Sequence, residues 1–224
     1  MENPKGEKIP NATTSGSYAY GWQQLKKYFL YFLAIILIVA IADSPFSKIS
    51  DMEWENSPVT YFLQMLAMAY GILFLPIIKY GGDILILRGI RNEELEFGEL
   101  VIGFKKNYLN IVLAHLITTA IIIIGFIFFI VPGIIFACRL VFVSYLVMDK
   151  NMEPIAAIEK SWAMTRGHGW RILGMALLAV PIFILGLICF IIGVVVSIMW
   201  IHSAFAALYY AIDLEEEATL IGGQ

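Results

Sequence analysis

Arg139 is the residue whose type and position point most clearly to chemistry. It is the single charged residue of the stretch Asn107–Met148, and a charge inside a membrane span costs about 2.5–3.5 kcal/mol on insertion scales. Its side chain is therefore expected to reach backbone carbonyls, a lipid phosphate or a bound group. Two interpretations stay open: a structural arginine capped by carbonyls, and an arginine that binds a ligand or a lipid headgroup.

His202 is the second candidate. It lies in the stretch Ile172–Ile212, which contains no Asp, Glu, Lys or Arg. Such a histidine is either neutral and hydrogen-bonded to a neighbouring helix or, together with Arg139, part of an intramembrane polar site for a ligand. His115, in the preceding long apolar stretch, is either neutral and hydrogen-bonded to a neighbour or a proton relay, and a relay is an alternative for His202 as well.

Three aspartates, Asp83, Asp149 and Asp213, end apolar stretches close to tyrosines. They either gather on one face of the protein or are solvated residues at separate helix ends. The helix dipole does not favour aspartate at a C-terminus, so a basic neighbour such as Lys79 or Lys150 is expected.

Motifs of known catalytic and metal sites are absent. The sequence contains no His-Glu-x-x-His, Cys-x-x-Cys, Gly-x-Ser-x-Gly or phosphate-binding loop, the patterns that supply metal ligands, nucleophiles or phosphate cradles. We therefore expect a protein that is not an enzyme, with no catalytic residues, no metal and no cofactor.

The elements that position these residues follow from composition. Of the 224 residues, 60% are hydrophobic and 15% are charged, whereas soluble domains have about 45–50% and about 25%. The mean hydropathy is +0.80. A soluble globule and a disordered chain are excluded, and the net charge of -3 gives no basic surface for nucleic acid. The sequence predicts an all-α integral membrane protein.

The charge-free stretches predict six transmembrane helices, because about 20 apolar residues span a bilayer. The two longest stretches each hold a helical hairpin, with breaks expected at Pro132-Gly133 and at Gly193. The six predicted spans are roughly 27–45, 59–81, 109–131, 134–148, 171–192 and 194–212.

Lysine and arginine set the expected orientation. With this layout all of them lie on one side except Lys48 and Arg139. Both termini are therefore expected in the cytoplasm and the chain in a prokaryotic cytoplasmic (inner) membrane, with Asp43–Pro58 as the main outer loop. An alternative is a cleavable signal peptide that ends near Ala40-Ile41-Ala42.

An internal repeat organises the spans. Each helix pair begins with a basic and aromatic segment, namely 21–30, 103–111 and 165–172. We interpret the chain as three tandem two-helix repeats within a transmembrane domain, 21–214. A flexible cytoplasmic tail, 1–20, precedes this domain, and an acidic cytoplasmic tail, 215–224, follows it.

Two short cytoplasmic amphipathic helices are expected between the hairpins. The first begins at Asn92 as N-cap, with Leu95, Leu100, Val101 and Phe104 on one face. The second spans 151–162, with Ile155, Ile158 and Trp162 at helical spacing. They either brace the bundle or form a docking surface for a partner.

The stretch from Pro132 to Trp170 carries a family resemblance. Its residues Pro132-Gly133, Arg139, Asp149, Pro154, Ala157, Ser161-Trp162, Thr165, Gly167 and Trp170 resemble a broad group of uncharacterised prokaryotic membrane proteins related to the glycerophosphodiester phosphodiesterase membrane domain. The resemblance implies a polytopic helical domain without an established activity. Phosphodiesterase activity belongs to a separate soluble domain in those proteins and is not implied here.

Two functions are compatible with these features. The first is a non-enzymatic membrane protein that organises lipids or partner proteins. The second is a small-solute or lipid transporter or exporter that acts as an oligomer, with Arg139 and His202 along its path. The expected partners are the lipid bilayer and either further copies of the chain or a membrane partner protein.

The topology has a direct test. Reporter fusions at Gln224 and at Trp54 should report opposite sides of the membrane, because an odd number of predicted spans separates them. A same-side result would overturn the six-span layout.

Overall fold

The computed structural model describes residues 9–50 and 57–222, and within these ranges the chain is helical with no strand. The predicted all-α membrane bundle is confirmed. The elements are α1 (Thr14–Lys27), α2 (Phe29–Ser50), α3 (Pro58–Leu73), α4 (Leu75–Ile90), the 3₁₀ helix η1 (Phe97–Phe104), α5 (Tyr108–Phe128), α6 (Ile130–Arg139), α7 (Val143–Asp149), α8 (Pro154–Met164), α9 (Gly169–Ile188) and α10 (Phe190–Gly222).

Five helical segments are long and apolar enough to cross a membrane, and a bent pair makes a sixth. The pair is α1 with α2, which meet at an angle of 96°. The other segments are Pro58–Ile90, Tyr108–Phe128, Ile130–Asp149, Gly169–Ile188 and Ile192–Thr219.

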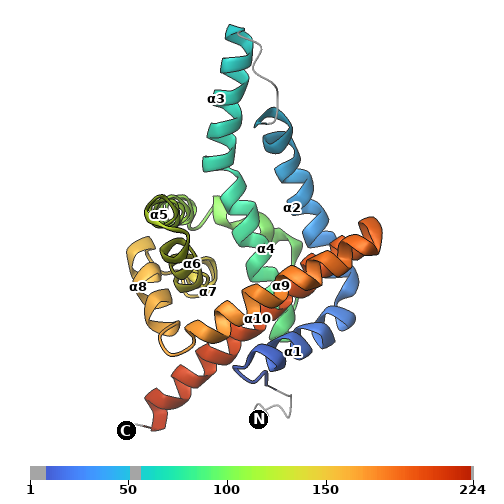
Figure 1. Ribbon diagram of the computed structural model, residues 1–224, viewed down its shortest axis with the longest axis vertical. Coiled ribbons are helices and arrows are strands. Elements are labelled where there is room, and N and C mark those ends of the chain that lie inside the picture. Colours follow the sequence, from blue (N-terminus) through green and yellow to red (C-terminus); the bar gives the residue numbers. More distant parts are fainter. Residues whose placement is uncertain (1–8, 51–56, 223–224) are drawn as a thin grey trace.

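The helices form three hairpins that diverge from a shared centre. Figure 1 shows α2 and α3 from the side, α5 end-on, and α9 and α10 diagonally across the view. The centre is built by α4, α7 and the second half of α10, where Leu87, Leu146 and Leu208 are fully buried. The three units therefore meet mainly through the helices that end them.

The hairpin turns lie a few residues before the predicted breaks. The chain turns at Phe129 and at Cys189, so Pro132 sits in the first turn of α6 and Gly193 inside α10. Proline is tolerated in a first turn. The glycines instead allow close packing: a Cβ on Gly186 would lie 2.7 Å from the Gly193 oxygen.

One predicted boundary is wrong in a way that matters for the site. The second span does not end at residue 81, because helical structure continues from Pro58 to Ile90. Lys79, expected at the cytoplasmic side, lies 3.0 Å from Asp43, expected in the outer loop. The acidic residues 51, 53 and 55 of that loop lie outside the described residues.

Both predicted tails are partly helical. α1 begins at Thr14 and buries Tyr18 and Tyr20, so the predicted flexible tail, 1–20, is wrong for residues 14–20. Figure 1 shows α1 alongside α10, and the Trp200 indole donates to the Tyr18 carbonyl at 2.9 Å. The predicted acidic tail, 215–224, continues α10 as far as Gly222.

Two asparagines end helices rather than begin them. Asn92, expected as an N-cap, and Asn151 have φ values of 58° and 51° and follow the last turns of α4 and α7. Asparagine adopts this left-handed conformation more readily than most residues and so ends helices. The segment after Asn92 consequently forms only η1, whereas α8 forms close to its predicted place.

Equivalent contacts in the three units support the repeat. In each unit a residue just before the first helix of the hairpin contacts a residue near the end of the unit, which follows α4 or α7 in the first two units and lies within α10 in the third. Lys27 donates to Asn92, Asn107 donates to Asn151 at 2.7 Å, and His168 lies 3.5 Å from Glu215. These contacts lie near the unit boundaries inferred from the basic segments, and the repeat itself stays a prediction.

Candidate functional site

A cavity of about 600 Å³ lies beside the centre of the fold, between α2, α4, α5, α7 and α10. Most of its wall is apolar, as in ligand pockets generally. We call it the Asp83 cavity. Its lining residues with polar side-chain atoms are Asp43, Lys79, Tyr80, Asp83, His115, Thr118, Ser144 and His202.

Four ionisable side chains of this cavity form two pairs, and the members of each pair lie close together. Lys79 Nζ lies 3.0 Å from Asp43 Oδ1, which joins α4 to α2. His202 Nδ1 lies 3.5 Å from Asp83 Oδ1, which joins α10 to α4. Within the described residues Asp83 has no Lys or Arg nitrogen within 4 Å, and the His202 ring is the one basic group within that distance.

α5 contributes two further polar groups. The Thr118 hydroxyl oxygen is buried and has no hydrogen-bond partner within residues 9–50 and 57–222. His115 lies one turn earlier on the same helix, and its ring meets the Tyr80 ring edge-on at 6.1 Å. A buried hydroxyl without a partner carries a free-energy penalty of roughly 1–3 kcal/mol.

The Asp83–His202 pair separates two cavities. A second cavity of about 300 Å³ is lined by Asp83, His202 and Ser144 together with residues of α7 and α10. These three residues line both spaces. The two cavities therefore adjoin at this pair.

The polar lining lies well inside the apolar spans. Depth is measured along each helix from a residue near its end, at about 1.5 Å per residue. Asp83 lies about 12 Å from Arg91 on this measure. Thr118 lies about 15 Å from Tyr108, and His202 lies about 16 Å from Asp213. Ionisable residues at such positions are costly, and they commonly mark solute or proton pathways.

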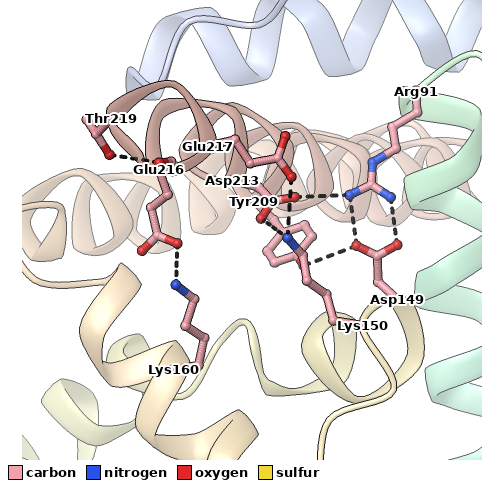
Figure 2. Close-up of polar contacts among 9 residues, drawn as sticks. All are labelled: Arg91, Asp149, Lys150, Lys160, Tyr209, Asp213, Glu216, Glu217 and Thr219. Atoms are coloured by element: carbon pink, nitrogen blue, oxygen red, sulfur yellow. Dashed lines mark hydrogen bonds and ion pairs between the residues drawn. The ribbon is translucent and has the colours of Figure 1, made fainter. Parts of the chain in front are cut away.

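The helices of the cavity are held together at one end by an ionic cluster. Figure 2 shows the Arg91 guanidinium facing the Asp149 carboxylate, with two hydrogen bonds of 2.6 and 2.8 Å. The same guanidinium reaches Asp213 at 3.4 Å. This bidentate geometry is the strongest form of an arginine–carboxylate pair.

Lys150 and Tyr209 complete what we call the Arg91 junction. Lys150 Nζ lies 2.5 Å from Asp213, and the Tyr209 hydroxyl donates to Asp149 at 3.2 Å. Burial opposes both basic charges, but the hydrogen bonds and charges of the carboxylates outweigh it and raise the pKa of Arg91 and of Lys150. Both side chains stay charged at neutral pH.

The Arg91 junction and the Asp83 cavity share three helices. Asp83 and Arg91 lie on or just after α4, Ser144 and Asp149 on α7, and His202 and Asp213 on α10. The junction therefore fixes how the three cavity-lining segments lie relative to one another.

The structure separates the two predicted site residues. His202 lines the Asp83 cavity, whereas Arg139 ends α6 outside it, with Nη1 3.5 Å from the Thr165 hydroxyl and its guanidinium 5.6 Å from the Trp162 ring. Ser161 donates to the Arg139 carbonyl at 2.8 Å. Arg139 thus packs on α8, and it does not share a site with His202.

The three aspartates are only partly brought together. Asp149 and Asp213 meet at Arg91, with Lys150 as the expected basic neighbour, whereas Asp83 lies on the cavity two turns before the end of α4. The sequence interpretation missed Asp43 and Lys79 as site residues. The spacing of Lys79 and Asp83, one helical turn apart, indicates only that these two residues share a helix face, and no local signal points to Asp43.

Comparisons of the chain with protein-family models, with curated proteins and with solved structures find no match. The described residues include no group of three or more His, Cys, Asp or Glu side chains that could hold a metal ion. The chemistry that the cavity offers is therefore that of its carboxylates, imidazoles, ammonium group and hydroxyls.

The Arg91 junction predicts a large stability difference between two matched alanine variants. Asp149→Ala leaves a mostly buried arginine without its main partner, which should cost about 3 kcal/mol of unfolding free energy. Lys160→Ala removes an ion pair with Glu216 that is about one-third exposed, which should cost less than about 1 kcal/mol. Unfolding in mixed micelles measures both, and equal losses would contradict the account.

Proposed function

We propose that this chain is a non-enzymatic, multi-pass membrane protein that binds a small cationic solute in the Asp83 cavity as a step of its transport. The observation that carries the proposal is the Asp83 carboxylate, which faces a cavity of about 600 Å³ without a Lys or Arg partner in the described parts of the chain. A carboxylate in that setting is stabilised by a positively charged guest.

The charges of the lining support a cation over an anion. Lys79 is paired with Asp43, so with neutral histidines the three groups Asp43, Lys79 and Asp83 carry a formal charge of one negative unit. The hydroxyls of Thr118 and Ser144 add hydrogen-bonding groups. An ammonium or guanidinium group would find a counter-ion and acceptors together.

The second cavity supports transport rather than storage. Asp83 and His202 line both spaces, so a guest that replaces the histidine beside Asp83 would weaken the contact between α4 and α10. Transport requires the protein to alternate between a state in which Asp83 contacts His202 and a state in which Asp83 contacts the solute. The proposed function is the solute-transporter hypothesis of the sequence analysis, with Asp83 in place of Arg139 as the main solute-binding residue.

The cellular setting belongs to the same proposal. We propose a prokaryotic cytoplasmic membrane with both termini in the cytoplasm. Basic residues at or near the Arg91 junction, such as Lys150, Arg88 and Lys160, favour the cytoplasmic side for this end of the bundle. Assembly into a homo-oligomer, or with a partner protein, stays a prediction from the sequence.

Thiol labelling tests the cavity and its charge preference together. In a background without Cys138 and Cys189, Thr118→Cys should react with a small cationic methanethiosulfonate faster than with an anionic one of similar size. The preference should fall roughly tenfold when Asp83→Asn is added, because the attracting charge is gone. Rates are measured by mass spectrometry of protein in liposomes.

Ala114→Cys, one turn earlier on α5, is the matched control, because Ala114 is fully buried and does not line the cavity. It should remain unmodified by either reagent. Equal rates of both reagents at position 118, with or without Asp83, would contradict cation binding in this cavity.

A further inference from the structure

A groove on the outside of the bundle is separate from the Asp83 cavity. It has a volume of about 530 Å³ and runs between α6 and the first turns of α9. We call it the Arg139 groove. Its lining residues are Val131, Ile134, Ile135, Cys138, Arg139, Gly167, Gly169, Trp170 and Leu173.

Arg139 is the one charged residue of this lining, and its charge is not neutralised by the surrounding protein. None of the carboxylates in residues 9–50 and 57–222 lies within 4 Å of its guanidinium. Its protein contacts are a long 3.5 Å hydrogen bond to Thr165 and the face of the Trp162 ring. The five N–H donors of a guanidinium are therefore largely unused.

The rest of the groove is apolar and open. Val131 and Ile135 are 65% and 48% exposed, and Trp170 is 86% exposed. A Cβ built on Gly169 would meet no atom within 4 Å. Because α6 and α9 belong to membrane-spanning segments, these apolar walls border the lipid phase.

We propose that the Arg139 groove binds one anionic phospholipid, with the lipid phosphate on the Arg139 guanidinium and an acyl chain along the α6–α9 wall. The charge complementarity decides the occupant: one uncompensated cation at an apolar groove matches one anionic headgroup joined to hydrocarbon. A phosphate accepts paired hydrogen bonds from a guanidinium. The aromatic surface of Trp170 suits the boundary between headgroups and acyl chains.

The proposal does not rest on solute binding. Lipid in this groove would contact α6, α9 and Gly167 just before α9, whereas the Asp83 cavity is built on α2, α4, α5, α7 and α10. The groove would instead give the protein a fixed lipid partner. That role corresponds to the lipid-organising hypothesis from the sequence.

Native mass spectrometry of the purified full chain tests the proposal. Phosphatidylglycerol should remain bound at one copy, whereas diacylglycerol with the same acyl chains should not, because it lacks the phosphate. Arg139→Gln should weaken phosphatidylglycerol binding at least about fivefold, and Arg139→Lys should restore part of it. Arg166→Gln is the matched control, since Arg166 is exposed nearby and does not line the groove.

Gly169→Leu provides an independent arm that leaves Arg139 unchanged. It should fill the groove and reduce lipid binding without loss of stability, because the space at this position is open. Unchanged phosphatidylglycerol binding in Arg139→Gln or in Gly169→Leu would overturn the proposal. Displacement of the lipid by glycerol phosphate at equal concentration would overturn it as well, because the headgroup alone would then account for binding.

Discussion

The bidentate pair between Arg91 and Asp149 is the contact on which the rest of the structure depends. Each hairpin is apolar on most of its surface and gains little by packing against another hairpin in place of lipid. The units diverge from their centre, so specific contacts must hold the three end segments together. Arg91 joins two of those segments to its own through Asp149 and Asp213.

The cavity is a consequence of this arrangement. α4, α7 and α10 converge on the Arg91 junction and separate beyond it, where α2 and α5 complete the wall. Charged groups in such a space are retained only when paired, and Lys79 with Asp43 meets this condition. Asp83 lies 3.5 Å from His202 and is the group to which the proposed cationic solute would bind.

Much of the fold could be predicted from the sequence, because apolar stretches of membrane length and the segments that precede them are local features. The hairpin starts near Lys27, Asn107 and His168 are examples. Asn92 was misread because asparagine favours both the start and the end of a helix. Lys79 was interpreted as one of the basic residues that set the orientation in the membrane. Its partner Asp43 lies on another helix, and the pairing of distant helices cannot be seen in one sequence.

The site was predictable only in part for the same reason. His202 was found because a histidine in a charge-free stretch is conspicuous. Asp83 was noted only as one of three aspartates that end apolar stretches, and Arg91 resembled an ordinary residue of a connecting segment. Arg139 drew attention by its isolation, and the fold assigns it to the surface groove rather than to the cavity.

The central claim is that the Arg91 junction holds the cavity-lining segments of α4, α7 and α10 in place. Hydrogen exchange of Arg91→Met in lipid nanodiscs, compared with the unaltered protein, tests it most directly. The account predicts faster exchange in 83–90, 143–149 and 202–213, with no change around the turns at 129 and 189. Faster exchange confined to the residues next to position 91 would contradict it.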